Sequence, residues 1–209
     1  LDVSASGLFG THSKTKIDTA AEICALLAFS AIQNNDKVGA IIFSDDVEEY
    51  VPPDKGRRHV LHVVRNVLYH TPKGRGTNLA GALEYLLKVI KRRAIVFVLS
   101  DFMAPDFSSS LAVAANKHDV VAIKISDSKE INPGASGLVR LWDQERGEER
   151  LIDLSGKAAR RRFDGLRGTR ELELESMFKR YNVDWVDVDT VSDYVKPLNV
   201  FFRARAKRK

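Results

Sequence analysis

The sequence AIVFVLSD, at residues 94–101, decides the fold class of this chain. Its first six residues are all apolar, and the run then ends at Ser100 and Asp101. A strand with one solvent-exposed face alternates apolar and polar residues, whereas a strand covered by helices on both faces is apolar throughout. Residues 94–99 therefore predict a central strand of a parallel sheet, buried on both faces and followed by a polar pair.

Strand-length apolar runs and longer helical patterns alternate on both sides of this strand. Apolar residues at helical spacing predict helices at residues 15–34, 59–69, 79–90 and 107–116. Apolar runs bounded by turn residues predict further strands at residues 38–43, 120–125 and 183–188. The alternation predicts the α/β class, with a doubly wound, mostly parallel sheet and helices on both faces.

Other segments add to this pattern. Residues 47–51 predict an antiparallel partner for the strand at 38–43, stopped by Pro52 and Pro53. Residues 138–154 predict a β-hairpin insertion around the turn at 144–147. Two helices complete the prediction: a long charged one at 157–181, interrupted near Gly165 and Gly168, and a last one at 194–206.

The length and composition indicate a single domain, residues 1–209, because one hydrophobic core suffices at this size. No stretch approaches the roughly 20 uninterrupted apolar residues of a membrane span, and the chain opens without the regions of a secretory signal. Cys24 is the only cysteine, so no internal disulfide forms. These features predict a cytoplasmic domain that makes no membrane contact of its own.

The formal net charge of +5 raises the alternative of a nucleic-acid-binding module. The excess is local, however, in a C-terminal run at 203–209 and a cluster at 160–162. A basic terminal run is more often a solvated end, and no basic strand carries interleaved aromatic residues that would stack on bases. We therefore expect no nucleic-acid partner.

Polar residues with oxygen ligands occur at three places where a predicted strand ends or a helix begins. They are Asp2, Ser4 and Ser6 near the start, Thr77 after Gly76, and Asp101 after the apolar strand. Ligands of open α/β sheets bind at the carboxyl ends of the strands, so the fold brings such segments together. Carboxylate and hydroxyl oxygens suit hard cations, and this set predicts a site for Mg²⁺ or Mn²⁺.

The pattern Asp-x-Ser-x-Ser, a distant Thr after Gly, and an Asp closing a buried strand resembles the metal-ion-dependent adhesion site of von Willebrand factor A (VWA) domains. The wider sequence resembles the bacterial domain-of-unknown-function 58 family, and this similarity runs over nearly the whole chain. It rests on GAIIFSD at 39–45, GTNLAGAL at 76–83, VLSDF at 98–102, HDVVAI at 118–123 and FFRAR at 201–205.

The resemblance implies a function as well as a fold. Ser4, Ser6 and Thr77 would bind the metal directly, and Asp2 and Asp101 would act largely through water. The domain would present the ion to a carboxylate of a protein partner and would not be an enzyme. Family members are similar to partners of MoxR-type AAA+ ATPases, which implies a role in complex assembly or metal-centre maturation.

One departure from the resemblance concerns the first strand. In VWA domains the Asp of Asp-x-Ser-x-Ser ends the central strand, yet only Leu1 precedes Asp2. We expect that the chain is N-terminally truncated, with a membrane anchor upstream in some relatives, or that a neighbouring chain supplies the pairing. The expected consequence is a metal loop that is disordered or empty without the upstream strand.

Two alternatives remain at this point: a Mg²⁺-dependent phosphoryl-transfer or hydrolytic enzyme using Asp2 and Asp101, and the basic nucleic-acid module. No general base or nucleophile motif accompanies the oxygen set, and no P-loop is present. The structural alternative is that these residues only cap helices and turns. The acidic residues between 45 and 49 are interpreted as a solvated turn and strand edge.

Overall fold

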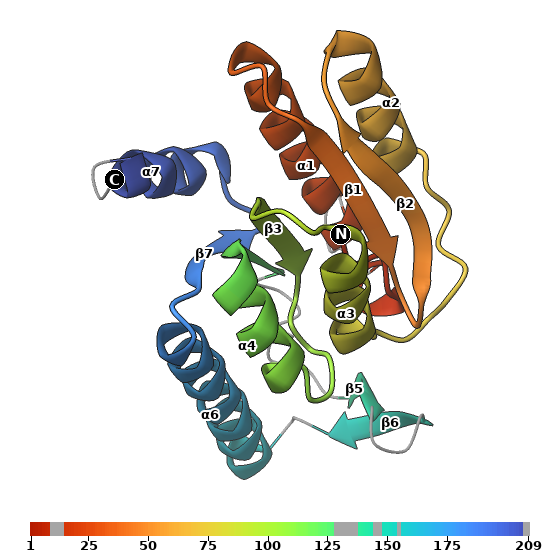
Figure 1. Cartoon of the computed structure of the whole chain (residues 1–209). Coiled ribbons are helices and arrows are strands. Elements are labelled where there is room, and N and C mark those ends of the chain that lie inside the picture. Colours follow the sequence, from red (N-terminus) through yellow and green to blue (C-terminus); the bar gives the residue numbers. More distant parts are fainter. Residues whose placement is uncertain (9–14, 128–137, 144–147, 154–155, 207–209) are drawn as a thin grey trace.

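The structure is a computed structural model, and it describes residues 1–8, 15–127, 138–143, 148–153 and 156–206. Strands β3 (Ile95–Ser100), β4 (Asp119–Ser126) and β7 (Asp184–Asp189) form a parallel sheet in the order β3-β4-β7. Strands β1 (Val38–Phe43) and β2 (Val47–Asp54) pair antiparallel beside it (Figure 1).

Residues 1–3 join these two groups of strands. The amide of Asp2 donates to the carbonyl of Leu99 at 3.0 Å, and that of Val3 donates to the carbonyl of Phe43 at 2.9 Å. The amide of Phe43 in turn donates to the carbonyl of Leu1 at 3.0 Å. Residues 1–3 therefore lie between β1 and β3, in the position of the central strand that the family resemblance implies.

Because residues 1–3 are so short a segment, they cover only the end of β3, and the beginning of that strand is less buried than predicted. Val98, Leu99 and Ser100 are buried, whereas Ile95 at the start of the strand is 54% exposed. Residues 1–3 reach β3 only near Leu99, so the beginning of the strand lacks a comparable neighbour on that side among the described residues. The prediction of burial on both faces is correct for the end of β3 and wrong for its beginning.

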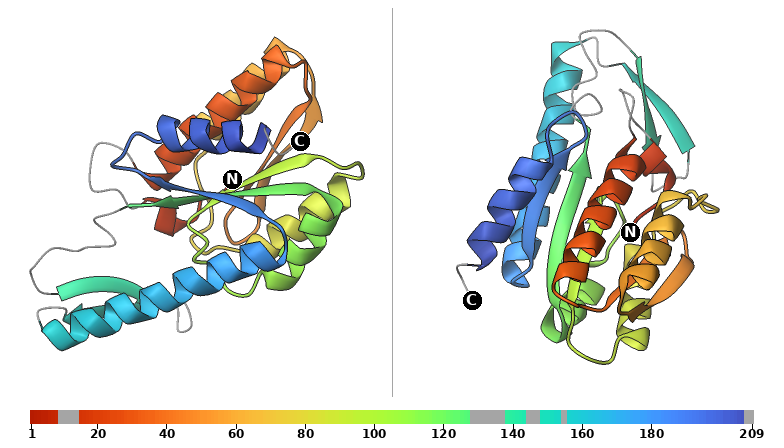
Figure 2. Two further views of the ribbon diagram at one scale, coloured as in Figure 1. Left: turned by 90° about the vertical axis from the view of Figure 1, so that its left-hand side faces the viewer. Right: turned by 90° about the horizontal axis from the view of Figure 1, so that it is seen from above.

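Helices cover both faces of the sheet (Figure 2). One apolar core combines buried residues of β3 and β4 with the three helices α3 (Leu79–Val89), α4 (Ser108–Lys117) and α6 (Lys157–Arg180). A second core, on the opposite face, involves α1 (Lys16–Gln33), α2 (Arg57–Leu68) and α7 (Val195–Ala206). The predicted doubly wound α/β class is confirmed.

The first helix, α1, has a well-defined beginning. The Thr15 hydroxyl accepts from the amide of Asp18 at 3.1 Å, and the Asp18 carboxylate accepts from the amide of Thr15 at 2.8 Å. This reciprocal cap satisfies amides that the first helical turn leaves free. It fixes the register so that Lys16, Ala20 and Ile23 all fall on the buried side of the helix.

Two details of the predicted elements are wrong. Strand β2 continues through Pro52 and Pro53 to Asp54. The two prolines fall at an irregularity of the pairing, between the pairs Ala40–Val51 and Val38–Asp54, and proline is tolerated at such a bulge. Helix α6 runs through Gly165 and Gly168 without a break, since a single glycine costs a helix only about 1 kcal/mol.

The predicted hairpin is confirmed as β5 (Leu138–Asp143) paired antiparallel with β6 (Glu148–Asp153), and its turn at 144–147 lies outside the described residues. So does the end of the basic run, at 207–209. Arg205 within that run is not a solvated residue, because its guanidinium forms ion pairs with Asp184 and Asp119. No helix in the described part of the chain is long and apolar enough to cross a bilayer.

Candidate functional site

A pocket opens where residues 1–3 and β3 end, and it contains most of the predicted site. Its polar lining comes from three segments: residues 2–6, the start of α1 and the end of β3 with the residue that follows it. These polar residues are Asp2, Ser4, Ser6, Lys16, Ser100 and Asp101. Segments separated by many residues in the sequence thus meet at one edge of the sheet, as the strand-end rule predicts.

Asp2 is buried, and both of its carboxylate oxygens accept hydrogen bonds. Oδ1 accepts from the amide of Ser4 at 2.9 Å, and Oδ2 accepts from the hydroxyl of Ser100 at 2.5 Å. Burial raises the pKa of the Asp2 carboxyl, and the hydrogen bonds from Ser100 and Ser4 offset part of that rise. Asp2 is thus held in one orientation at the bottom of the site.

The two serines of the pattern point at one another. Ser4 Oγ lies 3.1 Å from Ser6 Oγ, and Ser4 is almost fully buried. The short 3₁₀ helix η1 (Ala5–Leu8) fixes this arrangement, with the Gly7 amide donating to the Ser4 carbonyl at 2.9 Å. Two hydroxyl oxygens therefore face the same small volume.

Asp101 closes the pocket from the end of β3. Its Oδ1 accepts from the amide of Met103 at 3.0 Å, and its Oδ2 lies 3.2 Å from Nζ of Lys16. Both side chains of this ion pair are less than a tenth exposed. The ammonium group of Lys16 is therefore a positive charge next to the carboxylate and hydroxyl oxygens of the pocket.

Thr77 is not among the residues that line the pocket, although its loop is tied to the site. The carbonyl of Arg75 accepts from the amide of Ala5 at 3.0 Å, which joins this loop to the Ser4–Ser6 segment. The amide of Asn78 donates to the carbonyl of Ser44 at 2.7 Å, and the Asn78 side chain caps α3. Thr77 therefore lies next to anchored backbone, half-buried, between the loop and α3.

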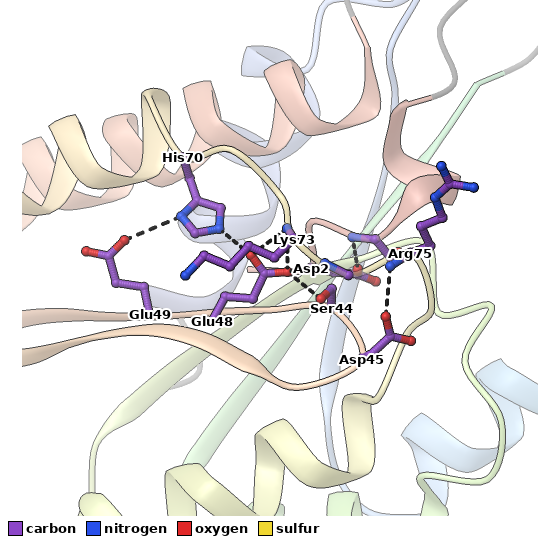
Figure 3. A network of polar contacts seen from close by, with 10 residues as sticks. Asp2, Ser44, Asp45, Glu48, Glu49, His70, Lys73 and Arg75 are labelled. Carbon is purple, nitrogen blue, oxygen red and sulfur yellow. Dashed lines mark hydrogen bonds and ion pairs between the residues drawn. The ribbon is translucent and has the colours of Figure 1, made fainter.

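The loop before Thr77 is held by the carboxylate of Glu48 (Figure 3). This side chain is only 4% exposed and accepts from the amides of Lys73 and Gly74 at 3.0 Å each, and from His70 Nε2 at 2.7 Å. Burial alone would raise the pKa of the Glu48 carboxyl, but hydrogen bonds from Ser44, Gly74, His70 and Lys73 outweigh it and lower the pKa to about 2. The interpretation of this residue as part of a solvated turn is wrong.

Asp45 holds the same loop from its other side. Its Oδ2 accepts from the amide of Arg75 at 2.8 Å. A Cβ atom at Gly74 or Gly76 would overlap the Asp45 carboxylate, so the loop can approach this closely only because both positions are glycine. The acidic residues after β1 thus position the loop that leads to Thr77.

The donor set fits a hard cation. Neighbouring oxygen ligands of an octahedral Mg²⁺ lie about 3 Å apart, because each bond measures about 2.1 Å, and the Ser4–Ser6 separation of 3.1 Å matches this spacing. Both Asp2 oxygens already accept hydrogen bonds, which suits a carboxylate that acts through water. Clusters of three or more His, Cys, Asp or Glu residues with metal-binding geometry are absent from the described residues, so hydroxyls would have to contribute.

Sequence reasoning missed Lys16 and the structural role of Ser100. The signal for Lys16 was its position: it lies three, four and seven residues before Thr19, Ala20 and Ile23, which form the buried stripe of α1. A lysine on the buried stripe of a helix needs a counter-charge. No comparable sequence signal pairs Ser100 with Asp2, because their contact joins residues 98 positions apart.

The fold is a doubly wound α/β domain, and the candidate site lies where residues 1–3 and β3 end. The family model described as "Protein of unknown function DUF58" matches residues 1–171, and the chain belongs to this family. The predicted family resemblance is thereby confirmed.

Two mycobacterial proteins with similar sequences are described as uncharacterized. The protein Rv1480 of Mycobacterium tuberculosis is 29% identical over 197 residues, which cover 89% of this chain and 62% of that protein. A protein of Mycobacterium avium is 28% identical over 147 residues, covering 65% of this chain and 87% of its own length. This chain thus spans less than two thirds of the length of Rv1480.

Solved structures share the fold at low sequence identity. The conserved hypothetical protein BatB from Bacteroides thetaiotaomicron aligns with a TM-score of 0.62 and 15% identity, covering 99% of this chain and 96% of BatB. An aerotolerance-related membrane protein from Bacteroides fragilis aligns with a TM-score of 0.61 and 15% identity, covering 97% and 96%. These similarities establish the shared architecture.

Proposed function

We propose that this domain is a protein-interaction module that binds a partner through a divalent metal ion, Mg²⁺ or Mn²⁺. Ser4, Ser6 and Thr77 would hold the ion, with Asp2 and Asp101 acting largely through water. The observation that carries the proposal is the convergence of Asp2, Ser4, Ser6 and Asp101 in one pocket. When bound, the ion would supply an electrophilic position that a carboxylate of the partner could complete.

The charges of the pocket support binding rather than catalysis. The two carboxylates provide two negative charges, and Lys16 offsets one of them. A bound divalent ion would therefore leave net positive charge, which attracts an acidic side chain. The pocket lining includes no histidine or cysteine, and its serine, lysine and aspartate side chains are hydrogen-bonded to one another or to backbone amides.

The partner we propose is a MoxR-type AAA+ ATPase, in a role in complex assembly or maturation and in the cytoplasm. This part of the proposal rests on what the resemblance to the domain-of-unknown-function 58 family implies, because the site itself specifies only an acidic group. It is tested by pull-down of the purified domain with a purified MoxR-type ATPase, in Mg²⁺ and in EDTA. Retention that is equal in both solutions, or absent from both, would contradict the metal-dependent partnership.

The metal site is tested by calorimetric titration of Mg²⁺ and Mn²⁺ into the wild type and into Asp101→Asn. We expect wild-type binding that the substitution weakens at least about tenfold, because one of the two carboxylates is lost. Asp106→Asn is the matched control, since Asp106 is exposed on the same loop and outside the pocket. Equal affinities for the wild type and Asp101→Asn, or no binding by the wild type, would contradict the proposal.

A further inference from the structure

The ammonium group of Lys16 lies within the proposed metal pocket. Lys16 is 4% exposed as a whole residue, and its Nζ is 3.2 Å from Oδ2 of Asp101. Burying a lysine is strongly unfavourable unless an opposite charge compensates it. The lysine therefore depends on the same carboxylate that the metal site uses.

The position of Lys16 on its helix makes this placement more demanding. Lys16 is the first residue of α1, where the free amides and the helix dipole produce positive potential. A cation is disfavoured at this end of a helix, and Asp18 in the same turn is occupied by the cap with Thr15. The ion pair with Asp101 therefore opposes an unfavourable potential at this end of the helix.

We infer that Lys16 is a built-in cation that neutralises Asp101 in the metal-free protein and competes with the metal for that carboxylate. This inference rests on the metal-binding function proposed above. With Asp2 and Asp101 ionised, Lys16 reduces the charge of the pocket from two negative charges to one. A divalent ion then enters a pocket that attracts it less and that already contains a neighbouring positive charge.

The competition has two consequences. The pocket stays folded without metal, because Asp101 is never left buried without a positive partner. Metal binding is also weaker than the oxygen set alone would give, so occupancy responds to the concentration of the ion instead of being permanent. A lysine that only joined α1 to β3 would have the first effect and not the second.

The test compares Lys16→Met, which keeps the apolar stem and removes the charge, with Lys16→Arg, which keeps the charge. Mg²⁺ affinity is measured by calorimetry, and the melting temperature is measured in EDTA and in saturating Mg²⁺. We expect Lys16→Met to bind Mg²⁺ at least about tenfold more tightly than the wild type, and Lys16→Arg to remain within about threefold. Lys16→Met should melt lower than the wild type in EDTA and recover that loss in Mg²⁺.

The outcomes separate this inference from the proposed function. If the wild type binds Mg²⁺ and Lys16→Met binds it equally or more weakly, Lys16 does not compete, and the metal site stands. If Lys16→Met melts lower by the same amount in both solutions, Lys16 is only a structural link. If neither the wild type nor any variant binds Mg²⁺, the metal site and the competition are both wrong.

A measurement on the wild type covers the case in which Lys16→Met does not fold. The NMR signal of the Lys16 Cε methylene, assigned by its loss in Lys16→Arg, should shift as Mg²⁺ is added, because the ammonium leaves Asp101. Signals of the exposed Lys55 and Lys196 are the internal reference. A Lys16 signal that stays unchanged while calorimetry reports binding would overturn the competition.

Discussion

The hydroxyl of Ser100 donates a hydrogen bond of 2.5 Å to Oδ2 of Asp2, and both residues are buried. The same hydroxyl accepts from the amide of Phe102 at 3.0 Å. Ser100 therefore connects the first carboxylate of the site to the turn that carries the second one, Asp101. One side chain thus sets the relative position of two segments that are distant in the sequence.

Replacing Ser100 with alanine should destabilise the protein by about 1–3 kcal/mol, because a buried carboxylate loses its donor. The Ser100 bond favours ionised Asp2, so the loss should be largest where Asp2 is ionised and should shrink as the pH falls. Urea unfolding at neutral and acidic pH measures both effects. Ser30→Ala, at an exposed position of α1, should change stability by less than about 0.5 kcal/mol. A loss that is independent of pH would refute the link to Asp2 ionisation.

Glu48 should make stability depend on pH in the acid range. The pKa of the Glu48 carboxyl is about 2 in the folded protein and 4.5 for an unperturbed glutamate. The contribution of Glu48 to the free energy of unfolding is therefore fully present above pH 4.5. As the pH falls from 4.5 towards 2, this contribution is progressively lost. Glu48→Gln should therefore cost on the order of 1–3 kcal/mol at pH 7 and less at pH 3.

Urea unfolding of Glu48→Gln and the wild type, at several values of pH, measures this difference. Glu173→Gln is the matched control, because Glu173 is exposed on α6. It should change stability by less than about 0.5 kcal/mol throughout. A Glu48→Gln deficit that grows towards pH 3 would contradict the hydrogen-bonded carboxylate.

Two glycine-to-alanine substitutions should have opposite signs. A Cβ at Gly76 would overlap the carboxylate of Asp45, so Gly76→Ala should destabilise by about 1–3 kcal/mol. A Cβ at Gly165, within α6, has no atom within 4 Å, so Gly165→Ala should stabilise by about 0.5–1 kcal/mol. Thermal unfolding of both variants checks the signs. Adding Asp45→Ala to Gly76→Ala should restore part of the loss, and strict additivity would show that the overlap is not the cause.

The start of α7 should be loosened by Tyr194→Phe. The Tyr194 hydroxyl donates to Oε2 of Glu22 at 2.6 Å, and this hydrogen bond, together with burial, raises the pKa of Tyr194 to about 12. A raised pKa means that the contribution is present below pH 10 and lost as the pH rises towards 12. We expect a loss of about 1–2 kcal/mol at pH 8 that disappears near pH 12, measured by urea unfolding. Tyr69→Phe, at a residue 80% exposed, should have no comparable effect.

Local patterns predicted the helices and strands closely. The apolar spacing over residues 15–34 predicted α1, which runs from Lys16 to Gln33, within one residue at each end. The run at 94–99 gave β3, shifted by one residue. Such elements follow from propensity and periodicity, which act within a few turns of chain.

The interior of the site could be predicted only in part. Asp2, Ser4, Ser6 and Asp101 were found because hydroxyls and carboxylates at strand ends follow a rule of topology. The roles of Glu48 and Lys16 depend on which side chains meet across the fold. The sequence around Glu48 would be the same whether water or backbone amides surrounded its carboxylate. The local sequence therefore gave no reason to expect the buried position, and a solvated turn was predicted.

The placement of residues 1–3 between β1 and β3 has a consequence for biosynthesis. Their hydrogen-bond partners at Ile41, Phe43 and Leu99 all come later in the chain. During synthesis, residues 1–3 therefore leave the ribosomal exit tunnel before the strands with which they pair. Lys16 likewise leaves the tunnel before Asp101, with which it forms its ion pair. Contacts of such sequence separation form slowly. The pocket can therefore form only after the segment that ends at Asp101 has been synthesised, and a nascent chain that ends before residue 101 should lack it.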